Sequence, residues 1–331
     1  MILTEKYILE RTYRKLSFWI GMVVLAVGLL TYMLTLEPTA SYWDCPEYIA
    51  VATGMQPGHP PGNPVWMLAA RFFINFSPAP QYDALAVNIL SGVCSALTVW
   101  ILYLTILWMA RRLVIREDRI TADKALISIG AAVAGALVFC WSDTFWFSAV
   151  EAEVYAFSSL CTALLFRLAL VWYDRRREPH SDRWLILIAY LTGLSLGVHE
   201  LNLLCLPAIA AVVIFGLYPR PGAARLTAGI LLSLGAVALV LYGLIPGFMA
   251  LAKAMELWCV NGAGLPFNSG LLLAWILVMG FLIAGAIRLP GCGLRPRLAR
   301  AASVCLWSAA MLLLGFSSYA VIIIRANAIP R

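Results

Sequence analysis

Nine separate stretches of the chain are long and apolar enough to cross a lipid bilayer, and this feature constrains the fold more than any other. A membrane-spanning helix needs about 20 mostly apolar residues. Of the 331 residues, 62% are hydrophobic and 12% are charged, whereas soluble domains carry about 25% charged residues. The sequence therefore predicts an all-α, polytopic transmembrane helical bundle and excludes soluble, disordered and collagen-like chains. The expected spans are residues 16–36, 84–110, 125–145, 154–173, 184–198, 203–217, 226–245, 271–287 and 301–321.

The basic residues cluster in short connections and predict the orientation of the chain. With a cytoplasmic N-terminus, 19 of the 24 Lys and Arg residues fall in the inner connections, as the positive-inside rule requires. The net charge of +7 is thus explained by topology, and no nucleic acid is expected as a partner. The inner cations are Lys6, Arg11, Arg14, Lys15, Arg111, Arg112, Arg116, Arg119, Lys124, Arg175, Arg176, Arg177, Arg183, Arg220, Arg225, Arg288, Arg295, Arg297 and Arg300, and the outer ones are Arg71, Lys253, Arg325 and Arg331.

The apolar stretch 184–219 allows two interpretations. As one span, it would turn Arg220, Arg225 and the Arg288 to Arg300 cluster to the outside. Two short spans with an external turn at residues 199–202 keep the charge rule, and we prefer them. The first apolar segment is expected to act as a signal anchor, because no small-residue cleavage site follows it.

The first outer connection, residues 37–83, is much longer than two neighbouring helices require, and such long connections are usually functional. Asp44 and Glu47 are three residues apart, so they share a face of a short helix that begins near Ser41. The GHPPGNP sequence around His59 then predicts a rigid, non-helical corner, because proline lacks an amide donor and restricts its predecessor. Residues 65–76 resume as an apolar helix expected in the membrane interface. The structural alternative for the two acids is a helix N-cap and a first-turn acid at a wet surface.

The other outer connections also carry acids, a histidine or amides. Glu151 and Glu153 are two residues apart, so on a helix they would point about 200° apart and only one would face a shared cavity. A carboxylate at the membrane edge without a basic partner is a candidate functional group, and a solvated loop is the alternative. His199 stands in the third outer turn, where a structural role competes with ligand binding. Asn261 belongs to the NGAGLPFNSG sequence, whose composition indicates a loop.

A site at the outer face follows from this distribution. Carboxylates beside a membrane-embedded cavity suit a reaction in which a lipid-anchored donor loses a sugar to an aqueous hydroxyl. One carboxylate would deprotonate the acceptor, while others would stabilise developing positive charge or hold a cation near the leaving phosphate. No Walker A, GxGxxG or HExxH motif occurs, so ATP-driven, dehydrogenase and zincin protease functions have no support.

The WDCPEYIA sequence, followed by GHPPGNP, resembles the first-loop signature of the GT-C superfamily of lipid-phosphosugar glycosyltransferases. The chain is similar to a bacterial membrane family related to eukaryotic protein O-mannosyltransferases, and AVEAEVYAFSSL, VHELNLL, VNGAGLPFNSG and SSYAVIIIRANA agree with it. Pro46 and Asn63 replace the family's usual glycine and small apolar residue. The resemblance implies one GT-C-like transmembrane module over residues 1–331. Family members generally continue into a large soluble region, so we expect a short paralogue, a fragment or a subunit.

The resemblance also implies roles for individual residues. Asp44 would be the general base, Glu47 its catalytic neighbour, and His59 would lie beside the donor phosphate or the acceptor. Glu153 corresponds to the second acidic motif and is preferred over Glu151. No cofactor is certain, and a divalent cation stays open because some GT-C enzymes use one. The expected substrate-binding residues are Glu151, Glu153, Tyr155, His199, Asn261 and Arg325, the last as a contact of the donor phosphate.

The function implied by the resemblance is transfer of a sugar, with mannose suggested by the related enzymes, from a polyprenyl-phosphate donor to a Ser or Thr hydroxyl of a protein or peptide. We expect a multi-pass protein of the bacterial inner membrane whose active site faces the periplasm, in contact with membrane lipid and with a partner subunit left open. Two alternatives remain. A lipid or sugar transporter would need charges along a path, but Arg167 is the one clearly intramembrane charge. A non-catalytic subunit or scaffold predicts that Asp44 and Glu153 do not share a cavity.

The charge distribution predicts nine spans, with the N-terminus inside and residue 331 outside. In a variant whose reactive native cysteines are replaced, a new cysteine at position 295 should react with a membrane-impermeant maleimide only after the membrane is opened. A cysteine in the first outer connection should react in intact cells and serves as the control. Labelling of position 295 from the outer side would overturn the assignment.

Overall fold

The computed structural model describes residues 2–115, 120–218, 220–293 and 295–328. It is 82% helical, and no strand occurs among these residues, which confirms the expected all-α fold. Three of the cations on which the topology assignment depends, Arg116, Arg119 and Arg331, lie outside the described residues.

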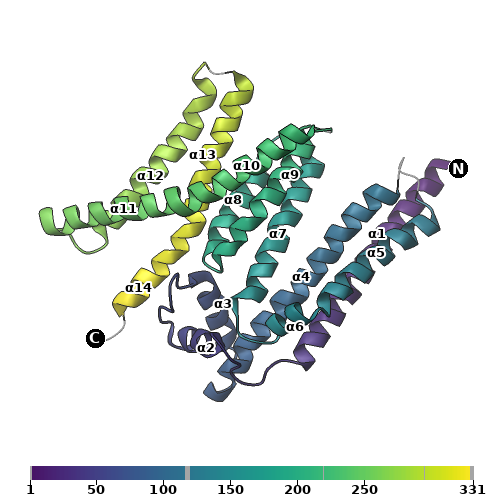
Figure 1. Ribbon diagram of the computed structural model, residues 1–331, viewed down its shortest axis with the longest axis horizontal. Helices are drawn as coiled ribbons and strands as arrows, with labels where there is room; N and C mark the ends of the chain where they lie inside the picture. Colours follow the sequence, from purple (N-terminus) through teal and green to yellow (C-terminus); the bar gives the residue numbers. More distant parts are fainter. Residues whose placement is uncertain (1, 116–119, 219, 294, 329–331) are drawn as a thin grey trace. The chain divides into compact units, whose positions relative to one another are not determined.

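The helices follow one another along the chain as Figure 1 shows, from the purple N-terminal helix to the yellow C-terminal one. The α-helices are α1 (Ile2–Leu34), α2 (Cys45–Gly54), α3 (Pro64–Ile74), α4 (Asp83–Val114), α5 (Ala122–Cys140), α6 (Asp143–Ala149), α7 (Val154–Arg175), α8 (Asp182–Leu196), α9 (Leu206–Leu217), α10 (Ala223–Leu239), α11 (Ile245–Leu257), α12 (Ser269–Arg288), α13 (Pro296–Phe316) and α14 (Ala320–Ala328). Short 3-10 helices lie at η1 (Pro80–Tyr82), η3 (Glu200–Cys205), η6 (Leu289–Gly291) and η7 (Ser317–Tyr319), and π-helical turns at η4 (Val240–Leu244) and η5 (Trp258–Gly262).

Eight helical segments among the described residues are long and apolar enough to cross a membrane, by length and composition. They correspond to eight of the nine expected spans. The remaining expected span, residues 184–198, is helix α8, which has 15 residues and ends at Leu196. A helix of that length extends about 22 Å, whereas the hydrocarbon core of a bilayer is about 30 Å thick. Helix α8 is shorter than a membrane span because it ends before the turn at residues 197–199.

The expected span 226–245 belongs to a helical segment that is longer than its sequence suggested. Helices α10 and α11 continue through the π-helical turns as one run, Ala223–Gly262, of 40 residues. Lys253, expected in an outer connection, therefore lies within α11 together with Glu256, and the loop proper is residues 263–268. The Glu256 carboxylate accepts hydrogen bonds from the backbone N–H groups of Asn268 (2.6 Å), Gly270 (2.9 Å) and Leu271 (3.1 Å). These bonds satisfy donors at the start of α12 that lack a partner within the helix.

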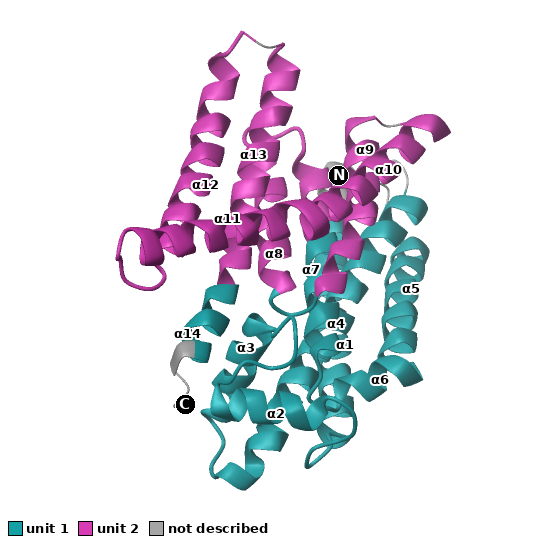
Figure 2. Ribbon diagram, turned by 60° about the vertical axis from the view of Figure 1, so that its left-hand side comes forward, with its two compact units in different colours: residues 1–167, 197–199, 319–331 teal, residues 168–196, 200–318 magenta. Residues whose placement is uncertain are grey.

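The chain divides into two compact units, which Figure 2 shows in different colours. Unit 1 comprises residues 1–167, 197–199 and 319–331, and unit 2 comprises residues 168–196 and 200–318.

In unit 1, two fully buried tyrosines join the long helices α1, α4 and α5. The hydroxyl of Tyr32 on α1 donates to the carbonyl of Cys140 at the end of α5 (2.8 Å). The hydroxyl of Tyr103 on α4 donates to the carbonyl of Ser17 on α1 (2.8 Å). A buried hydroxyl without a partner is costly, so these bonds favour one register of the three helices.

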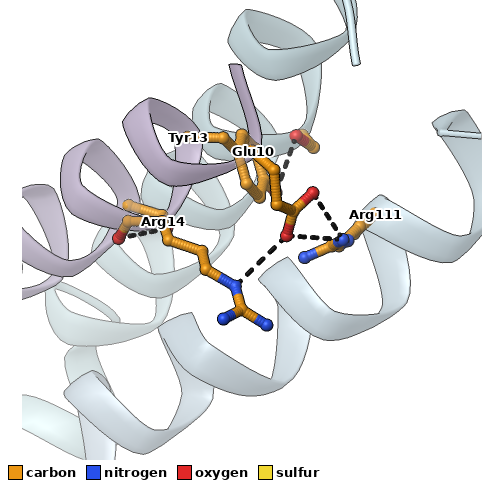
Figure 3. A network of polar contacts seen from close by, with 6 residues as sticks. Glu10, Tyr13, Arg14 and Arg111 are labelled. Atoms are coloured by element: carbon orange, nitrogen blue, oxygen red, sulfur yellow. Dashed lines mark hydrogen bonds and ion pairs between the residues drawn. The ribbon is translucent and has the colours of Figure 1, made fainter. Parts of the chain in front are cut away.

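A polar network joins the same helices near the N-terminus of α1 (Figure 3). Nη2 of Arg111 on α4 donates to both carboxylate oxygens of Glu10 (3.0 and 3.1 Å), and Oε1 of Glu10 also accepts from Nε of Arg14 (3.2 Å). The Arg111 guanidinium lies 5.4 Å from the ring centre of Tyr13, whose hydroxyl is 3.2 Å from that of Ser128 on α5. The Glu10 side chain is 32% exposed, so each pair contributes about 1 kcal/mol or less to stability.

In unit 2, helices α8 and α13 cross at a very short distance. A Cβ atom at Gly193 of α8 would lie 2.0 Å from the carbonyl oxygen of Leu312, and one at Gly315 of α13 would lie 2.3 Å from that of Tyr190. Small residues at a crossing let two helix backbones approach, which is a main source of helix association in membranes.

The α8/α13 crossing predicts that Gly193→Ala is strongly destabilising. Overpacking typically costs about 1–3 kcal/mol, and the clashing atoms here belong to the backbone, which cannot rotate away. Gly280→Ala on α12 is the matched control, because nothing lies within 4 Å of a Cβ atom there and alanine favours a helix. The midpoint of thermal unfolding in detergent should fall for Gly193→Ala and stay equal or rise for Gly280→Ala. Equal midpoints for the two variants would contradict the close crossing.

Candidate active site

The chain that leads into α2 is fixed beside the segment that precedes α7. Nδ2 of Asn88 on α4 donates to the carbonyls of Glu37 (2.6 Å) and Thr39 (3.1 Å). The N–H of Glu37 donates to the carbonyl of Val150 (3.0 Å). These bonds hold the acidic first connection, which carries Asp44 and Glu47, next to the segment that carries Glu151 and Glu153.

Asp44 occupies the N-cap position of α2, and the helix begins at Cys45. The expected start near Ser41 is therefore wrong by four residues: Trp43 has a left-handed backbone (φ 60°) and Pro46 stands in the first turn, so the helix begins after Trp43. Within the described chain, the exposed side chain of Asp44 makes no capping hydrogen bond to the helix. Asp44 at the N-cap and Glu47 in the first turn thus have the positions that the structural alternative expects, but the Asp44 carboxylate makes no capping bond.

Glu47, in the first turn of α2, binds His59 of the proline-rich corner. One carboxylate oxygen, Oε1, accepts from the backbone N–H of His59 (2.8 Å) and lies 3.1 Å from its Nδ1. The hydrogen bond from the His59 N–H, with the bond and charge of the imidazole, lowers the pKa of Glu47. This double contact fixes the imidazole on α2, with Nδ1 engaged and Nε2 on the opposite edge of the ring. The sequence predicts both residues at the catalytic site without predicting this contact, and their catalytic roles stay predictions.

Tyr48 is a central residue of the site that the sequence analysis did not select. Its ring lies 5.7 Å from that of His59 and 4.8 Å from that of Trp66, centre to centre. Its hydroxyl accepts from Nδ2 of Asn63 (2.9 Å). Burial and the negative charges of Glu153 and Asp44 raise its pKa. The available signal was its spacing, since it follows Asp44 by four residues, one helical turn.

Glu151 and Glu153 lie in a non-helical segment between α6 and α7. The expectation that only one of them can face a shared cavity assumed a helix and does not apply here. Each residue is only 5% exposed. The carbonyl of Glu153 accepts from Nε1 of Trp66 on α3 (3.1 Å). The N–H of Ala152 bonds the thiol of Cys45 at the start of α2, so this segment contacts both short helices.

The two buried carboxyl groups have raised pKa values. Burial raises the pKa of Glu153 to about 7, with smaller contributions from the charges of Glu151 and Asp44, while the Val154 N–H and His59 act in the opposite direction. Burial also raises the pKa of Glu151, against the effect of a hydrogen bond with the Ser41 side chain. The charge of exposed Asp44 thus acts on buried Glu153 across the space between α2 and the segment before α7.

Tyr155 and His199 lie at the edge of this acidic site. Tyr155 is in the first turn of α7, half exposed, and its ring centre is 5.6 Å from that of His199. The turn before His199 is fixed to α3, because the carbonyl of Gly197 accepts from the N–H groups of Val65 (2.8 Å) and Trp66 (3.2 Å). The contact with α3 therefore fixes the backbone just before His199, which lies beside Tyr155.

The remaining expected substrate-binding residues are Arg325 and Asn261. Arg325, on α14, donates from Nε to the carbonyl of Met55 (2.7 Å) and from Nη2 to that of Gly54 (3.3 Å), at the C-terminal end of α2. Its contact with a donor phosphate stays a prediction. Asn261 belongs to η5 in unit 2 and is exposed.

Among the described residues, no group of three or more His, Cys, Asp or Glu side chains has the arrangement needed to hold a metal ion.

Residues 44–221 match the family model described as the Protein O-mannosyl-transferase TMEM260 N-terminal domain, which is more than half of the chain. The chain belongs to this family. The match begins at Asp44 and includes the Glu151 to Tyr155 segment and His199. It confirms the expected relation to protein O-mannosyltransferases and identifies a membrane glycosyltransferase-related protein.

Two curated family relatives show the extent of the similarity. The chain is 25% identical over 191 residues to Protein O-mannosyl-transferase tmem260 of Dictyostelium discoideum, covering 54% of this chain and 21% of the relative. It is 25% identical over 241 residues to Protein O-mannosyl-transferase TMEM260 of Mus musculus, covering 72% and 31%. The chain thus spans about a fifth to a third of the length of these relatives. No solved structure matches the chain.

The raised pKa of Glu153 predicts a pH-dependent effect of Glu153→Gln on stability. The pKa of the Glu153 carboxyl group is about 7 in the folded protein, whereas its ordinary value, which applies to the unfolded chain, is 4.5. The stabilisation by protonated Glu153 is therefore complete below about pH 4.5 and is lost as the pH rises to about 7. Glu153→Gln removes this loss, so the variant should equal the wild type near pH 4.5 and exceed it at pH 8, by up to about 3 kcal/mol.

Thermal unfolding in detergent at the two pH values measures this difference. Glu47→Gln is the matched control, with an effect of opposite sign. The pKa of Glu47 is lowered in the folded protein, so its ionised carboxylate stabilises the fold at pH values above the ordinary pKa of 4.5. This stabilisation is lost as the pH falls through the lowered pKa. Glu47→Gln should therefore be less stable than the wild type at pH 8. A Glu153→Gln effect that does not change with pH would show that the carboxyl group is not buried in this way.

Proposed function

We propose that this chain carries the catalytic acids of a protein O-mannosyltransferase. In this proposal a mannosyl group moves from a polyprenyl-phosphate donor to a Ser or Thr hydroxyl of a protein, on the periplasmic side of the bacterial inner membrane. The observation that carries the proposal is the exposed Asp44, which makes no capping bond and whose charge acts on the buried Glu153, in a chain whose family bears this activity in its name.

Asp44 acts as the general base. It takes the proton of the acceptor hydroxyl while the hydroxyl oxygen bonds to C1 of the sugar, and the bond between C1 and the phosphate oxygen breaks with its electron pair leaving on the phosphate. An exposed carboxylate at a helix start suits this task, because it remains in contact with water and meets the aqueous acceptor. The N-terminus of α2 also favours a negative charge at this position.

The remaining acids and rings act on the donor. Glu153, when ionised, stabilises the positive charge that develops on the sugar ring. Glu47 holds Nδ1 of His59, which directs the other ring nitrogen toward the leaving phosphate. The half-exposed ring of Tyr155 and the neighbouring His199 offer a surface for the sugar.

An apolar cavity supports a lipid-linked donor. It has a volume of about 380 Å³ and is lined by the end of α3 and the start of α4, with Phe72, Phe73, Phe76, Leu85 and Ile89 among its residues. Helix α3 has 11 residues and so extends about 16 Å. It leads from Trp66, which bonds the Glu153 segment, to this cavity. The hydrocarbon chain of the donor would occupy it with the phosphate toward the acids.

The direct experiment is to incubate the purified protein in lipid nanodiscs with polyprenyl-phosphate mannose and a Ser/Thr-rich peptide. Mass spectrometry should show addition of one hexose to the peptide. Polyprenyl-phosphate glucose and a water-soluble nucleotide mannose in separate reactions test the sugar and the need for a lipid donor. No transfer from any donor, by protein that binds the donor, would favour the non-catalytic alternative.

Asp44→Asn should lower turnover by about 10²–10⁴-fold, the usual contribution of a positioned base, while donor binding persists. Asp143→Asn is the matched control, an exposed acid in the first turn of α6 outside the site, and should keep wild-type turnover. Glu153→Gln should change the apparent donor affinity more than Asp44→Asn does. Near-normal turnover by Asp44→Asn at equal folded protein would remove Asp44 from the mechanism and make Glu47 the next candidate.

A further inference from the structure

Two arginines from distant parts of the chain meet at the C-terminal end of α2. Arg71, in the last turn of α3, donates from Nη1 to the carbonyl of Thr53 (2.8 Å). Arg325, on α14, donates to the carbonyls of Gly54 (3.3 Å) and Met55 (2.7 Å). Three consecutive carbonyls are thus bound by two guanidinium groups.

These carbonyls are the groups that a helix end leaves without a partner inside the helix. A cation is favoured there, because the aligned peptide dipoles give the C-terminus a partial negative charge. Helix α2 ends at Gly54 and is followed by Met55 in the left-handed conformation (φ 50°), so its last carbonyls point out of the helix toward both arginines.

Helix α14 also touches the proline-rich corner. Gly62 is buried and has φ +93°, and a Cβ atom there would lie 3.4 Å from Cδ1 of Ile322 on α14. The same helix therefore contacts the end of α2 through Arg325 and the corner that carries His59 through Ile322. Arg325 is 270 residues away in the sequence from Met55, which it contacts at the end of α2.

The opposite end of α2 carries Asp44 and Glu47. Ten residues of helix form a rigid rod of about 15 Å, so a rotation at one end moves the carboxylates at the other. We infer that Arg71 and Arg325 act as positioning residues, which clamp α2 so that Asp44 and the Glu47–His59 pair face the substrate. This inference rests on the proposed function, and it gives Arg325 a role other than direct contact with the donor phosphate.

The test separates positioning from donor binding. Arg325→Ala should speed amide hydrogen exchange in residues 45–55 of the donor-free protein by roughly five-fold, since local openings expose unclamped helix ends. Turnover should fall by about ten-fold to a hundred-fold, as misplaced catalytic groups do, while the donor dissociation constant changes less than about three-fold. Arg325→Lys, which keeps the charge but can serve fewer carbonyls, should lie between Arg325→Ala and the wild type.

Arg71→Ala should speed exchange in the same segment, and Arg177→Ala, an exposed arginine of unit 2, should leave it unchanged. Unchanged exchange in Arg325→Ala, together with weaker donor binding, would overturn the clamp and show a direct phosphate contact. The exchange measurement needs no activity. If the wild type transfers no sugar, the proposed function fails, and the clamp is still judged by the exchange of residues 45–55.

Discussion

The acidic site depends on helix α3, because three segments that are far apart in the sequence bind its first two turns. The Gly197 carbonyl accepts from the N–H groups at the start of the helix, the Glu153 carbonyl accepts from the Trp66 indole, and Tyr48 accepts from Asn63 just before it. Each bond satisfies a buried or terminal polar group that would otherwise be costly. The residues around 48, 153 and 199 therefore come together through backbone and side-chain hydrogen bonds to one short helix.

The carboxyl groups of the site are held in different environments, and this difference gives them different chemistry. Glu47 is partly exposed and paired with His59, which lowers its pKa. Glu153 is buried among other acids, which raises its pKa to about 7. Asp44 lies exposed at the start of α2 without a capping bond. Environments that separate the pKa values of neighbouring acids allow one to stay ionised while another exchanges a proton, the arrangement that acid–base and glycosyl-transfer sites require.

The family match covers most residues of the candidate site. The matched region begins at Asp44 and ends at residue 221, and it contains the acids, the corner and α3. Arg325 lies beyond that region yet contacts the end of α2, so the last described helix of the chain contributes to the surroundings of the site. The clamp at the end of α2 and the bonds at the start of α3 act on the same small group of helices. These contacts hold the long, proline-interrupted connection at both α2 and α3.

The sequence by itself determined the fold class, the apolar segments and the composition of the site, because hydropathy over 20 residues and proline chemistry are local properties. From the sequence, Asp44, Glu47, His59 and Glu153 are predicted site residues, and their roles stay predictions. Only the tertiary structure decided that Glu151 and Glu153 lie outside a helix and are both buried, that α2 starts at Cys45, and that α8 is short. It also showed Tyr48 at the centre and Arg325 on the carbonyls of α2. These features could not be predicted, because burial, pKa shifts and hydrogen bonds between residues tens to hundreds of positions apart depend on how the segments pack, and the local sequence does not encode that packing.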